Sequence, residues 1–249
     1  MASKITLLLL LLFLGADQSK SFKDAQADYP RVREAYQEKQ GNLKALLQSK
    51  SISTDTFEIY LRAFKMDRQI ELWAKGKEGN RFTLIKTYRI CAISGEVGPK
   101  RKQGDLQIPE GFYHLNRFNP VSRYHLSLGI NYPNKSDRIL GGQANLGGDI
   151  FIHGSCVTAG CLPITNEQIK ELYIFCVEAR SNGQRNIPIS IFPSRLSDLE
   201  FEILKLNHQS DSEKIGLWTD LKRGFDFFNE TKQLPKVAFL QNGRHALSK

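Results

Sequence analysis

Cysteine is scarce in this chain, which has four among its 249 residues and none before Cys91. Four cysteines are too few to staple a chain of this length, so the class of small disulfide scaffolds is excluded and the core must hold itself together. A lipid anchor would need a cysteine directly after the small residues Gly15 and Ala16, and that place holds Asp17. The sequence therefore argues against a lipoprotein.

Long hydrophobic runs are also missing. The mostly apolar stretch from Ile5 to Leu14, with Lys4 before it and small residues after it, is too short for a typical transmembrane helix. It has the layout of a secretory signal peptide, which we predict over residues 1–20. A short anchor that is never cleaved is the alternative. We exclude this segment from the fold.

Acidic residues are outnumbered, 26 against 35 Lys and Arg, which gives a formal charge of +9. The basic residues are spread along the chain in short clusters such as 99–102, a pattern that favours a polyanionic surface in general. Because we predict export, we expect this surface to be an anionic cell envelope, with the protein peripheral to it, and not nucleic acid.

Changes in hydrophobic period divide the chain. Helical spacing predicts an N-terminal helical segment over 21–55, interrupted near Gly41. Alternating residues then predict a β-meander, and loops rich in Gly, Pro and Asn follow between short strands. A capping box at Thr165 and Gln168 begins a helix that ends near 181–183, and 186–193 returns as a buried strand. Residues 194–249 have helical spacing and are predicted to form a lid. The chain contains no internal repeat or low-complexity tract.

The segment 152–165 concentrates reactive side chains, with His153, Cys156 and Cys161 within nine positions. Together with Cys176 they could ligate zinc, but the spacing lacks the usual Cys-x2–4-Cys knuckle and Cys176 lies on an apolar helix face. A Cys156–Cys161 disulfide would suit an exported protein and would silence both thiols. The third interpretation makes Cys161 a nucleophile and His153 its base.

Several neighbouring residues favour the third interpretation. His153 ends an apolar strand, and Gly154 and Gly160 let the backbone turn sharply and a substrate approach. The helix after Thr165 would favour a thiolate at Cys161, and backbone N–H groups at Gly160 and Cys161 could bind an oxyanion. A thiol and an imidazole suit acyl transfer from an amide. A hydrogen-bonded core histidine remains the alternative for His153 alone.

The segments "PKRKQGDLQIPEGFYHLN", "SRYHLSLGINYPNKSDR", "GGDIFIHGSCVTAGCLPIT" and "IFPSRLSD" resemble the L,D-transpeptidase catalytic (YkuD) family. The likeness runs from about Phe57 to Pro193. Its His-Gly-x3-[Ser/Thr]-x-Gly-Cys motif matches at His153, Gly154, Thr158, Gly160 and Cys161. The resemblance implies an α+β, mainly β fold: an antiparallel β-sandwich-like core over 56–193 with one buried helix, flanked by N- and C-terminal helices.

The resemblance also implies function. Cys161 would attack a stem peptide of peptidoglycan as nucleophile, with His153 as general base and acid, and no metal or organic cofactor would be needed. Gly160, Thr158 and Gly154 would support the oxyanion or the base. We expect Tyr124, His125 and Arg101 to contact substrate, the arginine through a carboxylate.

The motif departs from the common family pattern at two positions, because Ala159 stands where many members have His and Pro163 where Arg is common. This is similar to the YafK-like branch, in which some members are thought to cleave a diaminopimelate-linked protein. From the family resemblance we predict a transpeptidase. The likeness to this branch makes a peptide hydrolase that uses the same site one alternative. A wall-binding module without catalysis is another.

Overall fold

The computed structural model describes residues 20–249. Apart from Lys20, the predicted signal peptide lies outside the described residues. Within them, no helix combines the length and apolar character needed to cross a bilayer.

Eight strands form one curled sheet in the order β3-β2-β1-β8-β4-β5-β6-β7. All neighbours pair antiparallel except β1 with β8 and β6 with β7. The strands are β1 Phe57–Phe64, β2 Gln69–Gly76, β3 Thr83–Arg89, β4 Gly111–Asn119, β5 Ser127–Ile130, β6 Phe151–His153, β7 Leu162–Pro163 and β8 Ile187–Phe192. The predicted α+β class is confirmed, and the expected sandwich takes the form of this single curled sheet.

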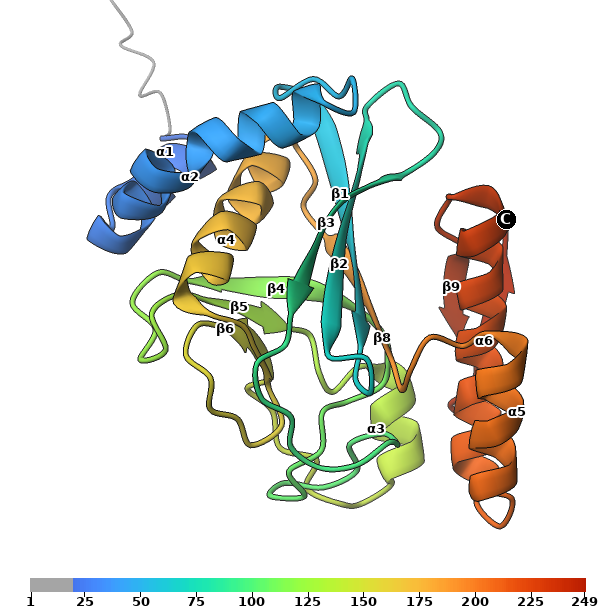
Figure 1. Cartoon of the computed structure of the whole chain (residues 1–249). Coiled ribbons are helices and arrows are strands. Elements are labelled where there is room, and N and C mark those ends of the chain that lie inside the picture. Colours follow the sequence, from blue (N-terminus) through green and yellow to red (C-terminus); the bar gives the residue numbers. More distant parts are fainter. Residues whose placement is uncertain (1–19) are drawn as a thin grey trace, which may run out of the picture.

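Helices cover the sheet from two sides, as Figure 1 shows. They are α1 Phe22–Ala27, α2 Pro30–Gln48, α3 Lys135–Gly141, α4 Asn166–Ser181, α5 Asp198–Asn207 and α6 Ser212–Thr231. Helices α1, α2 and α4 pack together over the large core, and α5 and α6 lie beyond β8 on the other side, around Phe64, Phe192 and Trp218. Because both sides are covered, nearly every side chain of β1 is buried and its alternation is lost.

The predicted capping box of α4 is present: the Thr165 hydroxyl accepts from the Gln168 N–H, and the Gln168 side chain accepts from the Thr165 N–H. The predicted interruption near Gly41 is wrong, because α2 runs through it. The break lies instead at 28–29, where Pro30 starts α2. A single glycine does not end a helix whose Leu43 and Leu47 are buried in the core.

The C-terminal segment differs from the predicted helical lid. After α6 it forms a hairpin of β9 Lys236–Phe239 and β10 His245–Ser248. Apolar residues of α5 and α6, Leu204, Leu217 and Trp218 among them, pack on the ends of β1 and β8. That packing places the segment away from the cleft described next, none of whose lining residues comes from it.

Candidate active site

A cleft of about 610 Å³ opens at the β5–β6–β7 end of the sheet. His153 and Cys161 both line it. The parallel pairing of β6 with β7 explains why: Ile152 is opposite Leu162 and His153 is opposite Pro163, so Cys161 falls level with Phe151. Positions 151 and 153 share a sheet face because side chains alternate along a strand. The fold therefore presents the imidazole and the thiol on one side, into one cleft.

One ring nitrogen of His153 is hydrogen-bonded to the backbone. Nδ1 lies 2.6 Å from the carbonyl oxygen of Gly154, which can only accept, so Nδ1 carries the proton and donates it. Nε2 is then the basic nitrogen. The side chain is 2% exposed, and this burial lowers the pKa of His153, with the Gly154 bond offsetting part of the effect. The histidine is held neutral, as a general base must be.

Tyr124 covers the imidazole. Its ring stacks on that of His153 with centroids 4.6 Å apart and planes 29° apart. Gly154 makes room on the chain beside it: a Cβ there would lie 2.6 Å from Asn166 Oδ1 and 2.8 Å from the Tyr124 carbonyl oxygen. Any larger residue would push the Tyr124 loop away from the histidine.

Cys161 is a free thiol, and its Sγ donates to the Asp149 carbonyl oxygen at 3.6 Å. Burial raises the pKa of Cys161, and the charge of Asp149 adds to this, while the Phe151 backbone N–H and Lys100 act in the opposite direction. The raised pKa of Cys161 runs against the expectation that the following helix favours a resting thiolate, because desolvation is the largest contribution. At rest, the cleft therefore holds a neutral thiol and a neutral imidazole.

The backbone N–H groups that were expected to form an oxyanion hole already donate hydrogen bonds to side-chain oxygens. The N–H of Cys161 donates to Thr158 Oγ1 at 2.8 Å, and that hydroxyl donates to the Cys161 carbonyl oxygen at 2.8 Å. The N–H of Gly160 donates to Ser94 Oγ, also at 2.8 Å. Gly160 has φ +118°, a conformation that favours glycine. Thr158 and Gly160 thus fix the backbone that carries Cys161.

Comparison with known proteins identifies the family. Residues 59–189 match the YkuD family, described as the L,D-transpeptidase catalytic domain. The chain belongs to this family. It is 37% identical over 193 residues, 77% of this chain and 74% of the relative, to YafK of Escherichia coli (strain K12), a protein provisionally named an L,D-transpeptidase. YafK of Escherichia coli O157:H7 gives the same values.

Solved structures with a similar arrangement are more distant in sequence. The helical cell shape determining protein Pgp2 from Campylobacter jejuni matches with a TM-score of 0.44 and 19% identity, over 75% of this chain and 74% of that chain. Bd1075 of Bdellovibrio bacteriovorus matches with a TM-score of 0.39 and 19% identity, over 74% of this chain and 75% of that one.

The cysteines of this L,D-transpeptidase family member pair differently from the disulfide alternative raised by the sequence. Cys156 is bonded to Cys91, 65 residues earlier, with Cα atoms 5.4 Å apart. Cys161 therefore keeps its thiol, and Cys176 is buried in α4 as a core residue. Among residues 20–249, no group of three or more His, Cys, Asp or Glu side chains is arranged to hold a metal ion.

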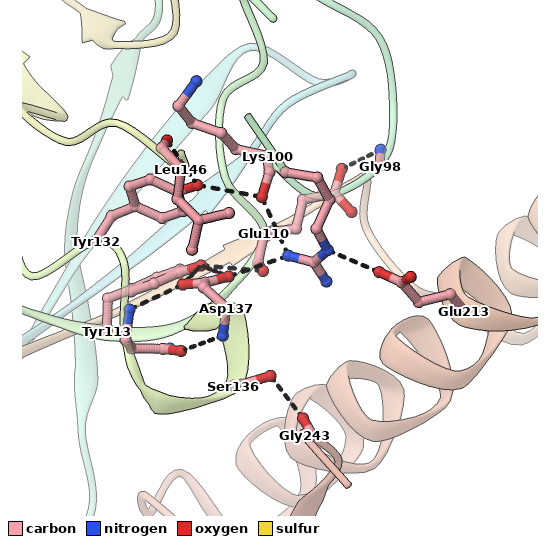
Figure 2. A network of polar contacts seen from close by, with 12 residues as sticks. Gly98, Lys100, Glu110, Tyr113, Tyr132, Ser136, Asp137, Leu146, Glu213 and Gly243 are labelled. Atoms are coloured by element: carbon pink, nitrogen blue, oxygen red, sulfur yellow. Dashed lines mark hydrogen bonds and ion pairs between the residues drawn. The ribbon is translucent and has the colours of Figure 1, made fainter. Parts of the chain in front are cut away.

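Of the three residues predicted to bind substrate, only Tyr124 lines the cleft. Arg101 is held elsewhere: its guanidinium pairs with Asp137 at 3.2 Å and with Glu213 at 2.7 Å. Figure 2 shows these two carboxylates on α3 and α6. His125 follows Tyr124 with φ +71°, and its Nε2 is buried without a hydrogen-bond partner in the described part of the chain. Neither residue is placed to bind substrate in this cleft.

Two arginines that the sequence did not single out line the cleft instead. Arg117 pairs with Asp149 at 3.2 Å and lies over the Phe151 ring. Arg123 makes no ion pair with any residue between 20 and 249. Both follow from the topology. Arg117 is opposite Gly129 of β5, which is opposite Phe151 of β6, and Arg123 lies in the loop from β4 to β5. Nothing in their local sequence distinguishes them from other surface arginines.

Proposed function

We propose that the protein is a peptidoglycan L,D-transpeptidase that acts on stem peptides through an acyl-enzyme on Cys161. The observation that carries this proposal is the free Cys161 thiol in the same cleft as a neutral, oriented His153. The site supports the chemistry of the L,D-transpeptidase family to which the chain belongs, and the name of that family is the reason for placing transfer before hydrolysis. The basic charge and the predicted signal peptide suit a peripheral location in the cell envelope.

The reaction needs only groups that the cleft provides. Nε2 of His153 takes the thiol proton as Cys161 Sγ attacks the carbonyl carbon of an L-centre that precedes a D-residue. The carbon–nitrogen bond breaks, the imidazolium gives its proton to the leaving amine, and a thioester remains. An acceptor amine then attacks the thioester carbon and loses a proton to His153. The carbon–sulfur bond breaks, and His153 returns this proton to the departing sulfur of Cys161. No metal or organic cofactor enters this sequence.

The same acyl-enzyme serves the alternative activity. If water attacks the thioester in place of an amine, the product is a shortened stem peptide or a released peptidoglycan-attached protein. We propose that Arg117 and Arg123 bind a carboxylate of the stem peptide in either case, because they bring positive charge to a cleft with Asp149 as its one lining carboxylate. Gly160 and Thr158 position Cys161, and Gly154 gives the Tyr124 loop its place.

Muropeptide analysis tests the proposal. Purified sacculi would be incubated with the wild-type protein, Cys161→Ala, His153→Ala and, as a matched control at the other free thiol, Cys176→Ala. We expect new cross-links through D-centres with the wild type and Cys176→Ala, and none with the two cleft variants. Shortened stems or released protein would establish the hydrolase. An unchanged profile with every protein, together with sacculus binding, would leave a wall-binding module.

Mass spectrometry of the intact protein, followed by peptide mapping after digestion, would then test the acyl-enzyme. With a disaccharide-tetrapeptide donor and no acceptor amine, we expect the donor fragment on the peptide that contains Cys161. Recovery of the adduct on another residue would contradict the assignment of the nucleophile.

A further inference from the structure

The loop between β4 and β5 lies between the proposed base and the N-terminal helices. On one side, Tyr124 stacks on His153, and the Leu126 carbonyl oxygen accepts from the Gly154 N–H at 3.2 Å. On the other side, the loop faces the start of α2. Tyr124 is 39% exposed, so its own burial is not enough to hold it in place. The stack on the histidine needs support from outside the loop.

Arg31, in the first turn of α2, provides that support. Its Nη1 donates to the Ser122 carbonyl oxygen at 2.5 Å and to the His125 carbonyl oxygen at 2.7 Å. These two carbonyls stand on either side of Tyr124 in the chain. Hydrogen bonds from a guanidinium are charge-assisted and stronger than those between neutral groups. A single side chain from the N-terminal segment therefore fixes the backbone on both sides of the stacking ring.

The conformation of the loop shows why it needs this fixing. His125 has φ +71°, a left-handed conformation that costs a non-glycine residue of order 1 kcal/mol or more. The Tyr124 N–H donates to Ser122 Oγ at 3.1 Å, a bond within the turn that does not tie it to the rest of the protein. Without Arg31, the bond from the Gly154 N–H to the Leu126 carbonyl oxygen still ties the loop after His125, but the turn from Ser122 to His125 can relax and withdraw the ring.

We propose that Arg31 is a positioning residue for the reaction: through the carbonyls of Ser122 and His125 it holds Tyr124 against His153. The inference rests on the proposed role of His153 as base. It gives the N-terminal helices a part in the active site, 122 residues before the histidine that they influence. The ring keeps water from one face of the imidazole, which keeps the base neutral and fixes its plane.

Arg33 provides a matched control on the same helix. Its Nη1 donates to the carbonyl oxygens of Ala27 at 3.2 Å and Asp28 at 2.6 Å, both inside the N-terminal segment. Loss of either arginine removes two bonds to backbone carbonyls and one positive charge from the start of α2. Only loss of Arg31 releases the Tyr124 loop.

The test is an NMR titration of the His153 ring protons in the full protein without substrate. The charged and titratable side chains that line the cleft beside His153 (Arg117, Arg123, Asp149 and Cys161) are unchanged in every variant. We expect Arg31→Met and Tyr124→Ala to raise the pKa of His153 toward its ordinary value of about 6.5, because both admit water to the ring. Arg33→Met and Tyr124→Phe should leave that pKa at its wild-type value.

Kinetics on a stem-peptide donor complete the test. Arg31→Met should lower kcat roughly 10-fold with little change in KM, as expected for a misplaced base. Arg31→Lys should recover part of kcat, and Arg33→Met should match the wild type. Should Arg31→Met fail to fold, the pKa of His153 would be measured by the same titration in Arg31→Lys and Tyr124→Ala.

Equal titrations and equal kcat for Arg31→Met and Arg33→Met would overturn the proposal. A protein that makes no muropeptide product would refute the proposed function, yet the titration, which needs no substrate, would still report whether Arg31 acts on His153.

Discussion

Single residues of the cleft have their pKa values set mainly by burial. The pKa of Cys161 is raised and that of His153 is lowered, so both groups are neutral near pH 7. Many cysteine enzymes instead hold a preformed thiolate–imidazolium pair that reacts even in mild acid. Here the thiol should ionise only as the base removes its proton during attack.

Alkylation by iodoacetamide would distinguish these two states. Because the pKa of Cys161 is raised, we expect slow labelling at pH 7 and a rate that climbs with pH beyond the ordinary thiol pKa of about 8.5. Peptide mass spectrometry would follow Cys161, with the buried Cys176 as an internal control that stays unlabelled while the protein is folded. Rapid labelling that is constant from pH 5 upward would show a resting thiolate.

Arg123 allows a test of charge recognition at the same scale. If it binds a substrate carboxylate, Arg123→Ala should lower kcat/KM about 10- to 100-fold on a stem peptide with free carboxylates, since hydrogen bonds to charged groups contribute roughly 1.5–3 kcal/mol. On a donor whose carboxylates are amidated, wild type and variant should differ little. Arg138→Ala, a basic residue on α3 outside the cleft lining, is the control. Equal losses on both donors would mean that Arg123 acts on the structure and not on the carboxylate.

The residues of the site could be predicted from the sequence only where they share a short motif. His153, Thr158, Gly160 and Cys161 lie within nine positions. The structure places His153, Thr158 and Cys161 in the lining of one cleft, with Gly160 directly before Cys161 in the chain. The position of Arg101 outside the cleft could not be predicted from a short motif. Its two acidic partners lie 36 and 112 residues further along the chain, and such ion pairs depend on the tertiary fold.

At the scale of elements, a disulfide fixes the loop that joins the proposed base to the nucleophile. Cys156 lies between His153 and Cys161, and its bond to Cys91 ties this loop to the segment that follows β3. The Cys91 N–H also donates to the Pro163 carbonyl oxygen at 3.0 Å, so the same segment borders β7. The bridge therefore restrains the backbone next to both reacting groups.

Removing both bonded cysteines would test this restraint. Cys91→Ser with Cys156→Ser should lower the free energy of unfolding by about 2–5 kcal/mol, the usual cost of losing a native disulfide. It should also slow acylation of Cys161, because the loop gains freedom. Urea denaturation and intact mass spectrometry would measure the two effects, and peptide mapping of the unreduced wild type would verify the pairing. Unchanged acylation in a destabilised variant would limit the bridge to stability.

Elements were predictable where local chemistry decides them. The capping box fixes the start of α4, and the β-meander is visible in strongly apolar runs. The bounds of α2 were not predictable in this way, because tertiary packing stabilises a continuous helix through Gly41. The strand character of 236–248 was missed as well, since β9 and β10 are short and only partly buried. The predicted domain boundaries at 56 and 193 stay a prediction.

At the scale of the whole molecule, the C-terminal segment braces the fold from the side opposite α2. Ser136 of α3 donates to the Gly243 carbonyl oxygen at 2.6 Å, a contact that Figure 2 shows, and Glu213 of α6 holds Arg101. The loop that carries Arg101 also provides Ser94, the acceptor for the Gly160 N–H. The segment thus supports the cleft through this loop without covering it.

Asp220 holds the segment itself together. It is 1% exposed and accepts hydrogen bonds from Arg223, which also lies on α6, and from Arg244 and the His245 N–H. The last two bonds join α6 to the start of β10. Burial alone would raise the pKa of Asp220, but the bonds from Arg244 and His245 outweigh it and hold the pKa well below its usual range. A depressed carboxylate pKa adds stability that is fully present above the unfolded-state value of about 3.9 and is lost as pH falls below it.

Asp220→Asn should therefore lower the free energy of unfolding at pH 7 by about 1.5–3 kcal/mol, because it removes charge-assisted hydrogen bonds from Arg223 and Arg244, whose guanidinium groups are partly exposed. The variant should lose less further stability than the wild type between pH 5 and pH 2, since it has no carboxylate to protonate there. Urea denaturation at a series of pH values measures both effects. Asp226→Asn, at a partly exposed i,i+4 pair with Lys222, is the control and should cost under about 1 kcal/mol. Parallel pH profiles for Asp220→Asn and the wild type would show that this carboxylate does not govern acid stability.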